Sequence, residues 1–190
     1  MDNTVYFAAI DASTTTTAIS ILSMIDDNKF MLHDKTSLIA PRLRKKDDSK
    51  FLNKKNMYDM FKFYFDSLNI RISFAVFENY SYGSPGHLAD LGELTGLFKF
   101  YLNSASIPFD TIPPTSVKMI VGKHGHASKP ALAEAIIPYV VNIKDFVFNN
   151  YDETDSVAVG IAYAIKMMGH IDEPTENIKP PKKVRRRKQP

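Results

Sequence analysis

Residues 4–24 read TVYFAAIDASTTTTAISILSM, and this stretch predicts two adjacent β-strands. The first run, residues 4–11, is almost continuously apolar and rich in the β-forming residues Val, Tyr, Phe and Ile, which is typical of a buried strand. Residues 14–24 are rich in β-branched Thr and Ile and predict a second strand after a short turn. The acid of the first run, Asp11, stands at its carboxyl end.

The remainder of the chain alternates between helical and strand patterns. A third strand at 30–39 follows the turn residues Asp26, Asp27 and Asn28. The further expected elements are a helix at 50–68, a strand at 72–78, a helix at 87–104, a strand at 107–112 and helices at 114–121, 128–139 and 152–168. This order predicts an α/β fold with a mixed five-stranded sheet, in which a three-strand antiparallel meander joins parallel strands, with helices on both faces.

Composition excludes several classes of site. The 190 residues are 44% hydrophobic and 24% charged, as in an ordinary globular domain. Because the chain has no cysteine, disulfides, thiolate metal centres and a thiol nucleophile are excluded. Its apolar runs are too short to span a bilayer, and the N-terminus has an acidic Asp2 and no basic region. We therefore expect a soluble cytoplasmic protein with no membrane partner.

Two basic segments stand out from an otherwise acidic chain. Residues 42–55 carry seven Lys or Arg and two Asp, and residues 179–190 carry seven Lys or Arg and no acid. Such segments favour polyanions, of which nucleic acid is the commonest in a cell, although a solvated surface is the alternative. The prolines and scarce apolar residues of 171–190 predict a disordered basic tail beyond a domain spanning 1–170.

Four carboxylates stand where a mixed sheet would bring them together. Asp11 and Glu78 end predicted strands, while Asp152 and Asp155 are three residues apart at the start of the last helix and so share a face. Oxygen ligands suit Mg²⁺ or Mn²⁺, and two such ions promote in-line phosphodiester displacement. Taken singly, each acid has a structural alternative, as a turn residue, a surface strand end or a helix-dipole partner.

These acids, together with the stretch PPTSVKMIVGKHGHASK at 113–129, resemble the RuvC family of Holliday junction resolvases, particularly its phage-encoded members. The resemblance covers residues 4–168 and implies the RNase-H-like fold. It implies that Asp11, Glu78, Asp152 and Asp155 bind metal and that Lys118 and Lys129 contact phosphate in catalysis. The turn after the first strand departs from the family, since AIDAST at 9–14 replaces Gly-Ile-Asp-Pro-Gly.

The resemblance also implies an activity and an assembly. It implies a homodimeric crossover-junction endonuclease with two Mg²⁺ per subunit, for which Mn²⁺ substitutes, that leaves 5′-phosphate and 3′-hydroxyl ends. The helix at 87–104 would form the dimer interface. Many members stack an aromatic residue on junction bases three residues after the glutamate. That position is Ser81 here, so Tyr80 or Tyr82 is expected to take the role. A phage protein would act in the cytoplasm of its bacterial host.

The residues expected to contact DNA come from the lysine-containing loop, the tyrosines and the basic segments. They are Lys118, Lys123, Lys129, Tyr80, Tyr82, Arg42, Arg44, Lys45, Lys46, Arg185, Arg186 and Arg187. Two alternatives stay open, namely a broader nuclease for forks and flaps and a non-catalytic module that binds branched nucleic acid. An enzyme of the actin or sugar-kinase type shares the Asp-x-x-Thr start, but 190 residues and eight glycines leave little room for its second domain and phosphate loops.

Overall fold

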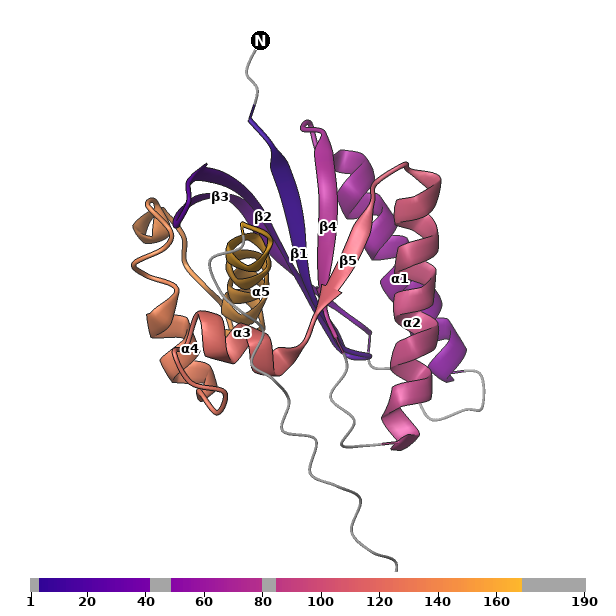
Figure 1. Ribbon diagram of the computed structural model, residues 1–190. Coiled ribbons are helices and arrows are strands. Elements are labelled where there is room, and N and C mark those ends of the chain that lie inside the picture. Colours follow the sequence, from indigo (N-terminus) through magenta and orange to yellow (C-terminus); the bar gives the residue numbers. More distant parts are fainter. Residues whose placement is uncertain (1–3, 42–48, 80–84, 169–190) are drawn as a thin grey trace, which may run out of the picture.

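The computed structural model describes residues 4–41, 49–79 and 85–168, which form a five-stranded sheet with helices on both faces (Figure 1). The antiparallel strands are β1 (Tyr6–Ala12), β2 (Thr16–Asp26) and β3 (Lys29–Ile39). They are followed by β4 (Ile72–Glu78) and β5 (Phe109–Ile112), which extend the sheet in parallel from β1. The strand order is β3-β2-β1-β4-β5, so the predicted meander joined to parallel strands is confirmed.

The helices fall into two groups according to the face of the sheet that they cover (Figure 1). On one face lie α1 (Ser49–Ser67) and α2 (Pro85–Ser104). On the other lie α3 (Pro114–Ile120), α4 (Lys129–Ala135) and α5 (Tyr151–Met167). A short 3-10 helix, Ile143–Asp145, lies between α4 and α5 in the chain. This arrangement confirms the prediction that helices cover both faces.

Alternation along β1 assigns its side chains to two hydrophobic cores. Phe7 and Ala9 belong to the core beneath α5, whereas Ala8 and Ile10 belong to the core beneath α1 and α2. Since successive side chains of a strand point to opposite faces, Asp11 follows Phe7 and Ala9 to the α5 face. The strand pattern therefore turns Asp11 toward the helix that carries Asp152 and Asp155.

Helix α5 packs against β1 and β2 through a close contact at Gly160. A Cβ atom built there would lie 2.6 Å from Leu22 Cδ1 and 2.9 Å from Ala9 Cβ. One turn earlier, Ser156 Oγ and Ser20 Oγ form a buried hydrogen bond of 2.5 Å. Both contacts hold the first half of α5 against the sheet.

The substitution Gly160→Ala is expected to destabilise the protein, although alanine is the better helix former. Helix propensity favours alanine by about 1 kcal/mol, while overpacking a close-packed core costs about 1–3 kcal/mol. Gly92→Ala is the matched control, because nothing lies within 4 Å of a Cβ at Gly92 in α2. The free energy of unfolding, measured in urea, should be about 2 kcal/mol lower for Gly160→Ala than for Gly92→Ala. Equal midpoints would contradict the close contact.

Helix α4 is shorter than its sequence pattern predicts. The pattern predicted a helix through Tyr139, but α4 ends at Ala135, so that boundary was wrong. Pro138 lacks an N–H and disfavours helical geometry at the residue before it, which explains the early end. The following residues instead cover the edge of β3, where Phe30 N donates to Tyr139 O at 2.9 Å and Phe30 pairs with Val140.

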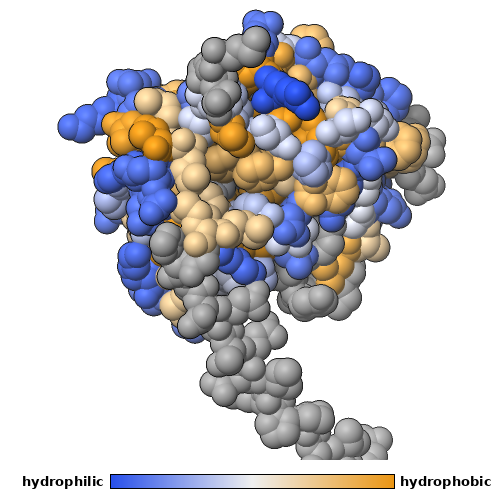
Figure 2. All heavy atoms as spheres, turned by 45° about the horizontal axis from the view of Figure 1, so that its top comes forward, coloured by the Kyte–Doolittle hydropathy of each residue, from blue (hydrophilic) through white to orange (hydrophobic). Residues whose placement is uncertain are grey.

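The surface at the end of the sheet where β1 begins mixes polar and apolar areas. Figure 2, with that end turned forward, shows hydrophilic residues around smaller apolar areas. Val5, Met24 and Ile25 are exposed large apolar side chains near this end. In residues 4–41, 49–79 and 85–168, no helix combines the length and apolar character that crossing a membrane requires.

Candidate active site

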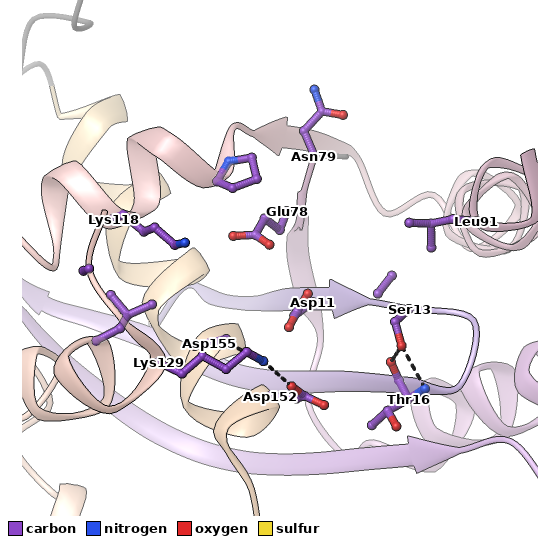
Figure 3. Close-up of a pocket in the computed structure, with 14 residues that line it drawn as sticks. Asp11, Ser13, Thr16, Glu78, Asn79, Leu91, Lys118, Lys129, Asp152 and Asp155 are labelled. Atoms are coloured by element: carbon purple, nitrogen blue, oxygen red, sulfur yellow. Dashed lines mark hydrogen bonds and ion pairs between the residues drawn. The ribbon is translucent and has the colours of Figure 1, made fainter. Parts of the chain in front are cut away.

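Four acidic side chains from three elements meet in one cavity at the carboxyl end of β1 and β4. Asp11 comes from β1 and Glu78 from β4, and Asp152 and Asp155 come from the first two turns of α5 (Figure 3). The cavity has a volume of about 400 Å³ and is lined by all four. Alternation explains Glu78, since Phe74 and Val76 of the same strand pack in the core beneath α5.

Three of these acids lie close enough to share one cation. One carboxylate oxygen from each of Asp11, Asp152 and Asp155 lies within 4.8 Å of the others. The helix start is fixed by Asn150, whose side chain accepts a hydrogen bond of 3.0 Å from the backbone N–H of Glu153. This cap places Asp152 and Asp155 one turn apart on the same helix face.

Two lysines complete the cavity. Lys129, the first residue of α4, places its Nζ 2.6 Å from Asp152 Oδ1 and 2.9 Å from Asp155 Oδ2. Lys118, on α3, lines the same cavity and points toward Glu78 (Figure 3). Gly122 allows the loop between them to approach α3, since a Cβ there would lie 2.7 Å from Lys118 O. The structure thus brings together all six residues that the sequence assigned to catalysis.

Three of the four acids, Asp11, Glu78 and Asp155, have raised pKa values. Burial, followed by repulsion from Asp155 and Asp152, raises the pKa of Asp11 to about 7. Burial and the charges of Asp11 and Asp155 raise the pKa of Glu78 to about 8. Burial also raises the pKa of Asp155, against the hydrogen bond from Lys129 that lowers it. Although burial lowers the pKa of Lys129, its bonds to Asp152 and Asp155 raise it above its ordinary value.

The donor set fits a hard divalent cation. Within the described part of the chain, Asp155 Oδ1 is buried and has no hydrogen-bond partner, which is costly for a carboxylate oxygen unless a ligand satisfies it. Carboxylate oxygens are the ligands that Mg²⁺ and Mn²⁺ prefer. Asp11, Asp152, Asp155 and Glu78 are therefore the residues that would hold such an ion.

Several cavity residues were not assigned from the sequence. Asn79 directly follows Glu78, and Ser13, Thr16 and Leu91 line the side of the cavity away from the lysines (Figure 3). Ser13 Oγ accepts from Thr16 N at 3.0 Å and donates to Thr16 O at 2.7 Å, so its hydroxyl closes the turn after β1. Ser13 and Asn79 could have been predicted as cavity residues because they lie within two positions of Asp11 and Glu78. Nothing in the sequence around Leu91 indicates that it lines the cavity.

The expected DNA contacts are only partly placed. Lys123 does not line the cavity, and its Nζ donates instead to Tyr139 Oη at 2.8 Å. Lys118 and Lys129, which were also predicted to contact DNA, line the cavity, and the nine remaining predicted contacts lie outside the described residues. They are Tyr80, Tyr82, Arg42, Arg44, Lys45, Lys46, Arg185, Arg186 and Arg187.

No protein-family model matches the sequence, and the search of curated proteins gave no significant match. Solved structures do match. RuvC of T. thermophilus, in complex with a Holliday junction substrate, is 17% identical with a TM-score of 0.73, over 87% of this chain and 96% of that one. The fold is the RNase-H-like fold of RuvC. This confirms the fold that the resemblance implied.

Two further structures have the same fold at lower similarity. The yeast mitochondrial Holliday junction resolvase is 13% identical with a TM-score of 0.56, covering 86% of this chain and 82% of its own. The fowlpox virus resolvase, solved with Holliday junction DNA, is 14% identical with a TM-score of 0.54, covering 84% and 99%. The fold therefore accounts for nearly the whole described chain.

Proposed function

We propose that this protein is a metal-dependent endonuclease that cleaves branched DNA, four-way junctions above all, and leaves 5′-phosphate and 3′-hydroxyl ends. The observation that carries the proposal is the convergence of four carboxylates and two lysines in one cavity, with Asp155 Oδ1 buried and lacking a partner among the described residues. The fold shared with resolvases solved on Holliday junctions supports DNA as the substrate. The place of action would be the cytoplasm, that of a bacterial host if the protein is phage-encoded.

Each of the six charged side chains named above has a part in this reaction. Asp11, Glu78, Asp152 and Asp155 would hold two Mg²⁺ ions, with Mn²⁺ as substitute. When bound, these ions would supply an activated water and neutralise charge at the scissile phosphate. Lys118 neutralises a phosphate oxygen. Lys129 does the same after leaving Asp152 and Asp155, because its Nζ bonds to those carboxylates when no cation does.

The experiment that tests the activity uses end-labelled four-way junctions beside fork, flap and linear duplex of matched sequence. The protein is incubated with each, with and without Mg²⁺. Symmetric nicks confined to the junction and dependent on metal are expected. Comparable cleavage of forks and flaps would replace the proposal by a general debranching nuclease. Tight binding without cleavage in Mg²⁺ or Mn²⁺ would replace it by a non-catalytic binding module.

We also propose a homodimer formed through α2. Leu97 and Phe100 are large apolar residues exposed on this helix, with Phe100 67% exposed. Two centres related by a two-fold axis would match the symmetry of a four-way junction. Phe100→Glu should therefore raise the dimer dissociation constant by at least about tenfold in analytical ultracentrifugation, since it buries a charge. Phe63→Glu, at a residue 75% exposed on α1, is the control. Equal dissociation constants would exclude this α2 surface.

The basic segments at 42–55 and 179–187 are proposed to bind the junction arms, with the tail at 171–190 lying outside the nuclease domain at 1–170. Ending the chain at Met168 should weaken junction binding and flatten its salt dependence. The slope of log affinity against log salt should fall by about 0.9 for each phosphate that the tail had neutralised. Binding curves between 50 and 200 mM salt measure this, in the range where such slopes are resolved. An unchanged slope would show that the tail does not contact DNA.

A further inference from the structure

Between Asp152 and Asp155, the start of α5 carries a further acid that does not line the cavity. This acid is Glu153, which is 1% exposed. In a helix, residue 153 is rotated about 100° from residue 152, which turns it toward β3. Ser156, three residues on, lies on the same face and bonds to Ser20 of β2.

Glu153 is held by hydrogen bonds from two parts of the chain. Its Oε2 accepts from Lys35 Nζ at 2.5 Å and from Asn149 N at 2.9 Å. Its Oε1 accepts from Asn149 Nδ2 at 3.2 Å and from Ser37 Oγ at 3.3 Å. The pair is well buried, because the side chain of Lys35 is only 10% exposed. The edge of the sheet is thereby tied to the residues that lead into the metal-ligand turn.

Stability alone does not account for a buried ion pair at this position. Desolvation of two charges offsets most of their attraction, and apolar residues of similar volume are often as stabilising. Farther along α5, Val157, Gly160 and Ile161 already dock the helix through apolar contacts. The ion pair instead constrains geometry. Hydrogen bonds have preferred directions, so they fix the rotation of α5 about its axis and the position of its first turn more closely than apolar contacts do.

We propose that Lys35 and Glu153 are positioning residues of the active centre, which hold the first turn of α5 so that Asp152 and Asp155 meet Asp11. This inference rests on the proposed function of the cavity as a metal centre. Neither residue lines the cavity, so both act through the two aspartates. Residues that orient metal ligands typically change metal affinity by 10–100-fold when they are replaced.

The test separates positioning from stability with a double variant. Lys35→Met/Glu153→Leu removes both charges and keeps the volume filled, so no buried charge is left unpaired. Urea unfolding should show only the smaller loss of the hydrogen bonds from Asn149 and Ser37. The Kd for Mn²⁺, measured by electron paramagnetic resonance, should nevertheless rise at least about tenfold. In the metal-free protein, amide hydrogen exchange of the peptide covering 149–156 should also become faster. If the double variant folds poorly, Glu153→Gln replaces it in the test, since this variant keeps the shape of the side chain and removes one charge. It should also raise the Kd for Mn²⁺ and speed amide hydrogen exchange at 149–156.

An exposed ion pair provides the control. Lys62 and Asp66 lie 2.5 Å apart on α1 with both side chains about half exposed, so Lys62→Gln/Asp66→Asn should change neither Mn²⁺ binding nor exchange at 149–156. If the wild type binds Mn²⁺ and the buried double variant binds equally well, the positioning role is overturned while the metal centre stands. If the wild type binds no Mn²⁺, the metal centre and the positioning role are both overturned.

Discussion

Replacing Asp11 by asparagine should lower the rate of junction cleavage by at least about a thousandfold, which corresponds to roughly 4 kcal/mol of transition-state stabilisation. Asp11 supplies the strand-borne oxygen of the three that lie within 4.8 Å of one another. Asparagine keeps the size of the side chain but removes the negative charge that a divalent cation requires. Single-turnover cleavage of a labelled junction in Mg²⁺ measures the loss, and binding of the uncut junction in Ca²⁺ should change far less.

The same substitution should stabilise the metal-free protein. Because burial and the charges of Asp155 and Asp152 raise the pKa of Asp11 to about 7, keeping it ionised at pH 8 costs the folded state about 2–4 kcal/mol. Asp11→Asn removes that cost and should raise the melting temperature at pH 8 by roughly 5–10 °C. Lost activity with gained stability is the behaviour of a residue kept for function.

Asp110→Asn is the matched control for this substitution. Asp110 belongs to the neighbouring strand β5, accepts a hydrogen bond of 2.9 Å from Tyr163 Oη and does not line the cavity. Its replacement should leave the cleavage rate unchanged and alter stability by no more than about 0.5 kcal/mol, as surface substitutions usually do. Wild-type cleavage by Asp11→Asn would show that Asp11 is not a ligand of the catalytic metal.

The sequence predicts the acidic cluster well because each member follows from a local rule. Asp11 and Glu78 end strands whose carboxyl ends lie at one edge of the sheet, and helical spacing puts Asp152 and Asp155 on one face. None of these inferences needs a distance between remote parts of the chain. The strand and helix order, which follows from the same periodicities, is confirmed for the same reason.

What the sequence could not predict depends on tertiary neighbours. Glu153 has the pattern of a solvated acid in a first helical turn, and it becomes a buried residue only because Lys35, 118 positions earlier, lies opposite. The bond from Lys123 to Tyr139, 16 positions later, likewise has no sign in the sequence, and the expected contact of Lys123 with DNA stays a prediction. The hydrogen-bond partner of a long polar side chain depends on which residues the fold brings near it. Composition and spacing therefore do not predict which way such a side chain points.

Raising the pH should destabilise the metal-free protein, and Mg²⁺ should reverse the effect. The pKa of Asp11 rises to about 7 and that of Glu78 to about 8, chiefly through burial, from ordinary values near 4. Both groups bind protons more tightly in the folded than in the unfolded state, so the free energy of unfolding falls as the pH climbs from about 4 to about 8. Below pH 4 both groups are protonated in either state and contribute nothing.

The expected loss between pH 6 and pH 9 is about 4 kcal/mol, or roughly 8–16 °C in melting temperature for a domain of this size. Mg²⁺ at ten times its dissociation constant should raise the free energy of unfolding by about 1.4 kcal/mol. At a fixed Mg²⁺ concentration this stabilisation should be larger at pH 9 than at pH 6, because Mg²⁺ binds ionised carboxylates. Thermal melts across this range, in EDTA and in Mg²⁺, measure both effects.

The double variant Asp11→Asn/Glu78→Gln makes the pH dependence specific to the cavity. With both buried acids made neutral, the melting temperature in EDTA should be nearly flat from pH 6 to pH 9, and Mg²⁺ should no longer raise it. A wild-type profile that is flat in EDTA would mean that the two carboxyls are solvated at ordinary pKa values. A double variant as pH-dependent as the wild type would instead place the titrating groups elsewhere. Either result would show that burial does not keep Asp11 and Glu78 protonated in the metal-free protein. Burial at the strand ends would then not explain how these carboxyls bind protons or a cation.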